Sequence, residues 1–229
     1  MLGVIVILFV SAVILYFFQQ KSIAVLGFRP PLKRLGQFLI GFLLMAMMCT
    51  AMRYIESMKE SFSWNVNHKI LISTIAEMVS WDFISVLTEE LTYRGALLYI
   101  LIMRFGSRIG IGVSAISFGI YHWFSFGVIG NPMAMLFVFL GTGLMGLAWA
   151  YAFDRTRSIF MPLGFHFGWN VTYNTIFSKG PQGQGLLTSS IGNHNGSSLF
   201  LIEFLVLPVL LFFVTKYFVP AMPGVADDR

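Results

Sequence analysis

Cysteine and charge are the two features that this sequence lacks most. Its 229 residues include one cysteine, Cys49, which excludes an intrachain disulfide, a thiolate metal cluster and a CxxC redox site. Only 11% of the residues are charged, against about 25% in a typical soluble domain, whereas 57% are hydrophobic. Polar side chains are therefore too few to cover a water-soluble globule. The same hydrophobicity excludes an intrinsically disordered chain.

Long apolar runs take up most of the chain. A helix needs about 20 apolar residues to cross the hydrocarbon core of a bilayer. The runs that approach or reach this length span residues 2–18, 35–52, 70–88, 109–129, 133–153, 158–177 and 198–219. We therefore predict an all-α fold, a polytopic transmembrane helix bundle of seven to eight helices. Residues 1–229 are expected to form a single membrane domain in contact with the lipid bilayer.

The number of helices depends on a shorter apolar run at residues 91–103. This run is too short to cross a bilayer alone. It either completes a spanning helix that starts near Val86 or forms a buried half-helix. Seven and eight helices are therefore both allowed.

The positive charges indicate how the chain crosses the membrane. The net charge of +5 does not indicate nucleic-acid binding, because most Lys and Arg residues lie in short segments between apolar runs. With seven helices, one side carries four of them, Arg53, Lys59, Lys69 and Lys179. The other side carries ten, at Lys21, Arg29, Lys33, Arg34, Arg104, Arg108, Arg155, Arg157, Lys216 and Arg229.

Basic loops remain preferentially in the cytoplasm. We therefore predict a multi-pass protein of the cell membrane whose ten-charge side is cytoplasmic. With eight helices, the 21–34 cluster would lie opposite the other basic loops, and the charges would divide less cleanly.

Ionisable side chains inside apolar runs are costly and tend to mark function. Glu90 and Arg94 are four residues apart, so on a helix they share a face and can form an ion pair. Glu89 points about 100° away from Glu90 and is left outside that pair. Near them, Glu77 and Asp82 either line an entrance or face a loop. Glu203 stands alone in the last run, which favours a structural or interfacial role.

Two further runs carry histidines. His166 and Asn170 are four residues apart, which places an imidazole and a carboxamide on one helix face. Asn174 continues that face. Phe118 and His122 have the same spacing, with the aromatic ring one turn before the imidazole.

Lipid cannot satisfy these polar faces, so three helices are expected to bury them against one another. A carboxylate, two imidazoles and an amide suit hydrolysis by activated water. Glu89, His122 and His166 also resemble a catalytic zinc set, although no HExxH spacing is present. A proton-coupled transporter could use the same groups as a relay, but no paired broken helices in two matching halves support it.

Three motifs resemble those of the CPBP family of intramembrane proteases. This family contains the type II CAAX prenyl endopeptidases and bacteriocin-processing or self-immunity proteins. EExxxR is matched at residues 89–94, FxxxH at 118–122 and HxxxN at 166–170. The resemblance covers about residues 70–178, whereas the flanking segments 1–69 and 179–229 share only hydrophobicity.

The resemblance implies a role for each motif residue. Glu89 would be the general base, and His122 would share the attacking water with it. His166 and Asn170 would stabilise the oxyanion of the tetrahedral intermediate. Glu90 would orient the site through Arg94, as scaffold rather than chemistry.

The family mechanism needs no metal, so no cofactor is expected. The alternative is a zinc ion held by Glu89, His122 and His166. Substrates would be peptides or membrane-anchored proteins cut near the cytoplasmic face, and no nucleic acid is expected as a partner. The charge distribution further predicts that the polar cavity opens toward the basic-loop side.

Overall fold

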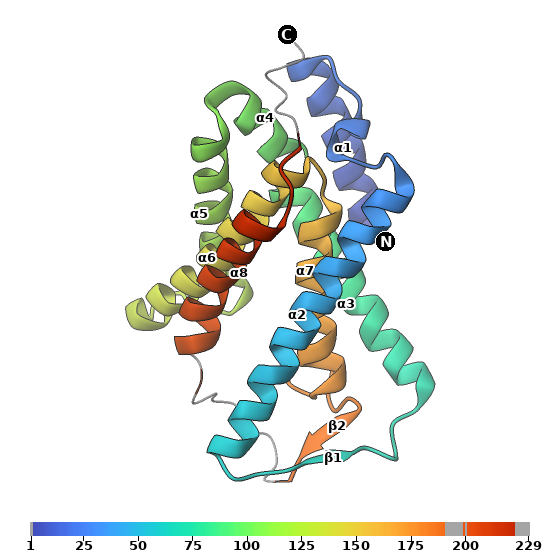
Figure 1. Cartoon of the computed structure of the whole chain (residues 1–229), viewed down its shortest axis with the longest axis vertical. Coiled ribbons are helices and arrows are strands. Elements are labelled where there is room, and N and C mark those ends of the chain that lie inside the picture. Colours follow the sequence, from blue (N-terminus) through green and yellow to red (C-terminus); the bar gives the residue numbers. More distant parts are fainter. Residues whose placement is uncertain (1, 191–198, 200, 223–229) are drawn as a thin grey trace.

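The computed structural model describes residues 2–190, 199 and 201–222 (Figure 1). Long helices run up and down the molecule and are joined by short loops. The α-helices are α1 (Leu2–Gln19), α2 (Pro31–Lys59), α3 (Ile72–Tyr93), α4 (Ala96–Phe105), α5 (Ser107–Ser125), α6 (Pro132–Thr156), α7 (Phe160–Asn170) and α8 (Leu207–Phe218). Shorter elements are the 3₁₀ turn η1 (Ile23–Leu26) and the π-helical segments η2 (Val171–Ile176) and η3 (Ile202–Val206).

The mostly helical fold is confirmed, with one small exception. Strands β1 (Trp64–Val66) and β2 (Leu187–Ser189) pair antiparallel, with Trp64 opposite Ser189. The all-α prediction missed this ribbon, because three residues are too few to show the two-residue period of a strand.

The short run 91–103 does not complete a helix that starts near Val86. Val86 lies inside α3, which ends at Tyr93, and α4 starts separately at Ala96. A Cβ atom at Gly95 would overlap the carbonyl oxygen of Leu91, so the break requires glycine. α4 has 10 residues and is about 15 Å long, half the thickness of a bilayer core. The half-helix alternative is therefore the one that the structure contains.

The basic loops meet at one end of the molecule. The Ile159 N–H donates to the Leu26 carbonyl oxygen at 3.0 Å, and the Met222 N–H donates to the Arg155 carbonyl oxygen at 2.8 Å. The Arg104 guanidinium lies 5.3 Å from the centre of the Phe18 ring at the end of α1. We call this the basic end and define it as residues 20–34, 104–108, 154–159 and 216–222.

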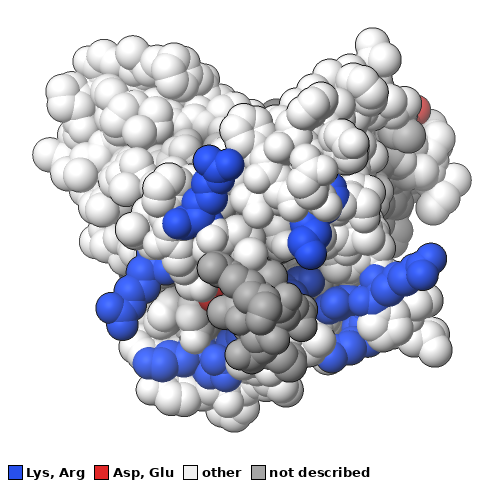
Figure 2. Space-filling model, turned by 90° about the horizontal axis from the view of Figure 1, so that it is seen from above, with Lys and Arg blue, Asp and Glu red and all other residues white. Residues whose placement is uncertain are grey.

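Figure 2 shows the molecule from the basic end. Several Lys and Arg side chains are spread over this face, and hardly any Asp or Glu is visible. The same grouping underlies the seven-helix charge count, in which residues 21–34 share a side with the other basic loops. The charge division of the eight-helix alternative, which puts residues 21–34 opposite the other basic loops, does not match this placement. Arg229, counted with this side, lies outside the described residues.

Several of the counted charges lie in helices rather than in loops, and two of these are buried. Arg34 and Arg53 belong to α2, where they are 5% and 0% exposed. Arg34 donates to the Thr156 carbonyl oxygen at 3.0 Å and so joins α2 to the end of α6. The long helix α2 thus extends at both ends beyond the predicted run 35–52, because buried partners satisfy its terminal charges.

Three of the described helices, α1, α2 and α6, are long and apolar enough to cross a membrane. The chain is therefore a membrane protein. Helix α3 carries four acidic residues and so lacks the composition of a simple membrane span. Helix α7 is short and continues into the π-helical segment η2, so it lacks the length of one. The seven crossings stay a prediction.

Helix α7 packs against α2 at backbone distance. A Cβ atom at Gly164 would overlap the Phe38 carbonyl oxygen, and one at Gly168 would overlap the Phe42 carbonyl oxygen. The rings of Phe38 and Phe42 lie beside Phe167, with centroid distances of 6.2 and 5.7 Å. Small residues permit this close approach, as is typical of helix contacts in membranes. It fixes the height of α7, which carries the HxxxN motif.

We expect Gly164→Ala to destabilise the protein by about 1–3 kcal/mol, because the added methyl group forces α2 and α7 apart. Gly112→Ala in α5 is the matched control, since its Cβ atom would meet nothing within 4 Å. Thermal melting in detergent measures both. A Gly164→Ala variant that melts with or above the wild type would contradict this account of the packing.

Candidate active site

The predicted ion pair between Glu90 and Arg94 is present and fully buried. Arg94 Nε donates to Glu90 Oε2 at 2.7 Å, and Arg94 Nη2 donates to Glu90 Oε1. Both side chains are 0% exposed. The Arg94 guanidinium also lies over three aromatic rings, 4.3 Å from the Phe118 centroid, 5.1 Å from that of Trp149 and 5.8 Å from that of Tyr93. The charge is thus enclosed by a carboxylate and aromatic faces rather than by water.

Glu90 also reaches His166, a contact that its sequence position did not reveal. His166 Nδ1 lies 2.8 Å from Glu90 Oε1, across 76 positions of the chain. Because an ionised carboxylate only accepts, Nδ1 carries the proton of this hydrogen bond. Glu90 therefore orients His166 directly, in addition to its pair with Arg94.

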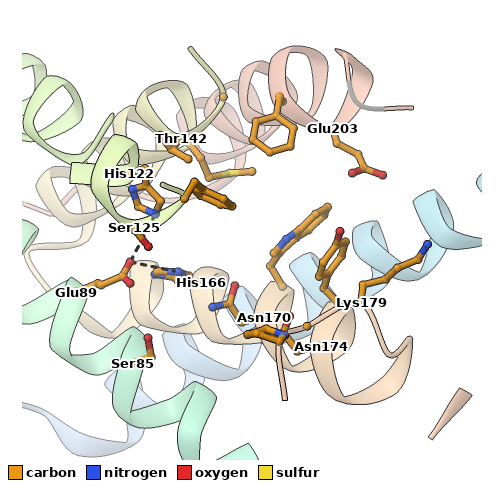
Figure 3. Close-up of a pocket in the computed structure, with 18 of the residues that line it drawn as sticks. Ser85, Glu89, His122, Ser125, Thr142, His166, Asn170, Asn174, Lys179 and Glu203 are labelled. Atoms are coloured by element: carbon orange, nitrogen blue, oxygen red, sulfur yellow. Dashed lines mark ion pairs between the residues drawn. The ribbon is translucent and has the colours of Figure 1, made fainter. Parts of the chain in front are cut away.

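Glu89 lies between the two motif histidines (Figure 3). Its Oε2 atom is 4.0 Å from His122 Nε2 and 3.9 Å from His166 Nε2. His122 Nδ1 lies 2.8 Å from the Phe118 carbonyl oxygen, so this nitrogen also carries a proton. Both imidazoles consequently present Nε2 to the same carboxylate oxygen. Helices α3, α5 and α7 each contribute one group.

The distances from Glu89 Oε2 to the two Nε2 atoms can be compared with those expected for a bound water molecule and for a zinc ion. Two acceptors that share one water molecule, each at about 2.8 Å, stand about 4 Å apart when the angle at the water is near 90°. Zinc with ligands at about 2.0–2.1 Å in a tetrahedron requires about 3.3 Å between them. In the part of the chain that the structure describes, no trio of His, Cys, Asp or Glu side chains is close enough to hold a metal ion. The separations of 3.9 and 4.0 Å are closer to the spacing expected for a shared water than to that of zinc ligands.

Asn170 lies one turn after His166 and lines the same cavity. Asn174, one turn further, donates to Asp82 Oδ1 at 2.6 Å. Asp82 is 0% exposed and therefore belongs to the packing between α3 and η2. Glu77 is exposed and does not line the cavity.

Trp149 is a residue of the site that the motifs did not reveal. Its ring stacks on the His166 ring, with centroids 4.2 Å apart and an interplanar angle of 24°. Phe118 packs edge-on against Trp149 at 5.7 Å and against His122 at 4.4 Å. In the sequence, nothing distinguishes it, because run 133–153 also contains Phe137, Phe139, Tyr151 and Phe153.

These groups face a cavity of about 920 Å³. Its walls also include residues of the end opposite the basic loops, namely Arg53, Glu56, Ser125, Phe126, Lys179 and Pro181. Among the residues that the structure describes, none of those that line the cavity belongs to the basic end. The prediction that the cavity opens toward the basic-loop side is therefore wrong. Loop charges report which side a loop occupies, whereas the direction of a cavity depends on where the helices diverge.

Glu203, predicted to stand alone, belongs to a buried charge cluster on the far wall of the cavity. Arg53 forms ion pairs with Glu203 and, at 2.5 Å, with Glu56. Lys179 Nζ lies 3.6 Å from Glu56 Oε1. The cluster joins α2, η3 and the segment after η2, so Glu203 has a partner 150 positions earlier in the chain.

Comparison with known proteins agrees with the three motifs. A family profile described as type II CAAX prenyl endopeptidase Rce1-like matches residues 71–172. This match supports membership of the CPBP family. The matched segment coincides with the predicted extent of the CPBP resemblance, about residues 70–178, and it contains all of the motif residues. No curated protein and no solved structure matches the chain. At the level of the family, the match supports a CAAX-type intramembrane protease.

Removing one partner of the Glu90–Arg94 pair strands a buried carboxylate, at a cost of about 3–5 kcal/mol. We therefore expect Arg94→Ala to lower the folded yield in detergent and the melting temperature. Arg94→Lys, which keeps the charge but not the paired hydrogen bonds, should lose less. Wild-type yield and melting in Arg94→Ala, with activity alone lost, would show that Arg94 acts in the chemistry.

Trp149 is expected to position His166. Trp149→Leu removes the stacked ring, an interaction worth about 0.5–1.5 kcal/mol, and should slow cleavage by about 2- to 10-fold. Trp149→Phe retains a flat ring and should recover most of the rate. Single-turnover rates per folded molecule separate this effect from lost stability. If the Trp149→Leu and Trp149→Phe variants cleave at equal rates, Trp149 contributes only to packing and does not position His166.

Proposed function

We propose that the protein is an intramembrane endopeptidase that hydrolyses a peptide bond with a water molecule activated by Glu89 and His122. The observation that carries the proposal is the convergence of Glu89 Oε2 with two imidazole Nε2 atoms at 3.9–4.0 Å inside the cavity. The substrate would be a peptide or a membrane-anchored protein. The ten-charge side of the seven-pass chain would be cytoplasmic.

The hydrogen-bond partners of the two imidazoles distinguish their roles. His122 Nδ1 donates to a neutral carbonyl, so the neutral imidazole keeps a lone pair on Nε2 that accepts a hydrogen bond from water. His166 Nδ1 donates to the Glu90 carboxylate, which leaves a charged partner beside the ring when Nε2 also carries a proton. His166 Nε2 can then donate to the oxyanion, as the amide of Asn170 does.

The proposed reaction proceeds through a tetrahedral intermediate. Glu89 takes a proton from the water as its oxygen attacks the scissile carbonyl carbon, and the carbonyl oxygen becomes negatively charged. His166 and Asn170 donate hydrogen bonds to that oxygen. The carbon–nitrogen bond then breaks, the proton held by Glu89 passes to the leaving nitrogen, and the products are a carboxylic acid and an amine.

A proton-coupled transporter built on the same groups is less well supported. Such a protein needs a polar path that continues to both sides of the membrane. Here the polar groups end at the Glu90–Arg94 pair. Beyond it, toward the basic end, lies an apolar cluster of buried residues that includes Leu98, Ile102 and Phe153.

Metal dependence separates the water mechanism from the zinc alternative. Cleavage by the purified protein should survive exhaustive chelation. Asn170→Ala should lose about 10²–10³-fold in turnover, as expected for one oxyanion donor, whereas Glu89→Gln should lose nearly all activity. A proteomic comparison of cells that express the wild type or Glu89→Gln would supply the substrate. Activity that disappears with chelator and returns with Zn²⁺, at about one metal equivalent per chain, would favour zinc.

A further inference from the structure

We infer that Asp82 is a positioning residue of the active site, because the hydrogen bond that it accepts from Asn174 holds Asn170 in place to donate to the oxyanion. The inference rests on the proposed function. It uses a contact between two residues that lie outside the three motifs and 92 positions apart in the chain.

Helix α3 and the α7–η2 segment are joined by two side-chain hydrogen bonds of the same kind. In each, a buried carboxylate of α3 accepts from a side-chain nitrogen of α7–η2. Glu90 accepts from His166 Nδ1 at 2.8 Å, and Asp82 accepts from Asn174 Nδ2 at 2.6 Å. From the first bond to the second, the chain moves back eight residues on α3 and forward eight residues on α7–η2. The two bonds are therefore rungs of one antiparallel register, and we call them the two rungs.

Two of the proposed catalytic groups lie between the rungs. Glu89 is next to the first rung on α3, and Asn170 is midway between His166 and Asn174, one helical turn from each (Figure 3). On α3, the rungs are eight residues and about 12 Å apart. One rung alone would let the two helices change their angle about it, and the distance between Glu89 and Asn170 would then vary. Two rungs fix that distance.

The backbone that follows Asn170 needs this support, because it leaves the α-helical hydrogen-bond pattern there. Segment η2 starts at the next residue, and its Phe177 N–H donates to the carbonyl oxygen of Thr172, five residues earlier, at 3.0 Å. Such π-helical turns are rare and occur frequently at functional sites. A wider turn changes the direction of the side chains that follow it. The bond from Asn174 to Asp82 therefore determines how this turn lies against α3.

The Asp82–Asn174 bond is enclosed by the protein. Asp82 is 0% exposed and Asn174 is 8% exposed. A Cβ atom at Gly180 would lie 2.6 Å from the Asn174 side chain, so the segment after η2 covers the carboxamide at backbone distance. A buried carboxylate without a donor is costly, and dense packing leaves the carboxamide little room to turn away. The bond thus holds one orientation.

The choice of a carboxylate at position 82 favours a role beyond packing. An apolar side chain would fill the same space at lower cost, since ionisable groups inside membrane proteins are expensive and tend to mark function. A hydrogen bond fixes the direction of its partner, whereas apolar contact is non-directional. Asp82 is therefore expected to contribute more to the cleavage rate than to stability.

Paired substitutions test the inference. Asp82→Leu/Asn174→Leu keeps the number of side-chain heavy atoms and removes both polar partners, a change that can be nearly neutral for stability. It should melt near the wild type and slow single-turnover cleavage by about 10- to 100-fold, because a misplacement of about 1 Å can cost about 10²-fold. Asp82→Asn/Asn174→Asp exchanges donor and acceptor, keeps a charged acceptor and should stay within about 3-fold of the wild type.

The probe is an internally quenched peptide with the sequence that is cut in cells with the wild type and not in cells with Glu89→Gln. The Leu pair should lower kcat with KM unchanged, as expected when an interaction made only in the transition state is lost. In the Asn170→Ala background, the same pair should cause less than about 3-fold further loss, because residues that act as a unit are not additive.

Ser107→Ala is the matched control for the loss of a hydrogen bond between helices. It removes a bond of 2.9 Å from Ser107 Oγ to Asp154 Oδ1, between α5 and α6 and outside the cavity. Its cost in stability is about 1 kcal/mol. Its cleavage rate per folded molecule should equal that of the wild type.

Other results overturn the inference or the proposed function. A Leu pair that cleaves at the wild-type rate would show that the second rung contributes only to packing. A loss of equal size with and without Asn170 would show that Asp82 acts on another group. If the Leu pair does not fold, Asp82→Asn/Asn174→Ala, which leaves no unpaired carboxylate, replaces it with the same expected losses. If Glu89→Gln and Asn170→Ala both cleave the probe like the wild type, the proposed function itself fails.

Discussion

The structure depends above all on the buried ion pair between Glu90 and Arg94. A charge in this position is tolerated only with a partner, and here the guanidinium is held by two hydrogen bonds and covered by the rings of Phe118 and Trp149. The same carboxylate binds His166, and the same tryptophan stacks on that ring. One pair thus ends α3, joins α3 to α7 and sets the plane of an imidazole that faces Glu89.

The lipid environment explains why a second charge cluster forms at the far wall of the cavity. Arg53 and Glu56 lie on α2 within the protein, where neither water nor lipid can satisfy them, so they pair with Glu203 and Lys179. The cavity extends between this cluster and the catalytic groups (Figure 3). Its two ends are therefore fixed by ion pairs, whereas its side walls are largely aromatic. This arrangement leaves the helices separated only on the side away from the basic loops.

Local periodicity accounts for what the sequence predicted well. Residues four apart on a helix share a face, so Glu90 and Arg94 were expected to pair, and His166 and Asn170 were expected to face one cavity. The length of the apolar runs placed most helices within a few residues. The order and spacing of three motifs were enough to predict the family. These inferences hold because each uses residues that are close in the chain, where the backbone itself determines which side chains are neighbours.

Other features depended on the tertiary structure alone. The Glu90–His166 contact spans 76 positions, and the Arg53–Glu203 pair and the Trp149–His166 stack also join separate helices. The sequence therefore left Glu203 without a partner and gave no reason to choose Trp149. It also predicted the wrong direction for the cavity, because loop charges determine on which side a loop lies and not where helices diverge. The sequence determined the family, the helices and the motif faces. The packing of apolar α4 side chains above the ion pair, together with the close contact of α2 and α7, decided which end of the site is open.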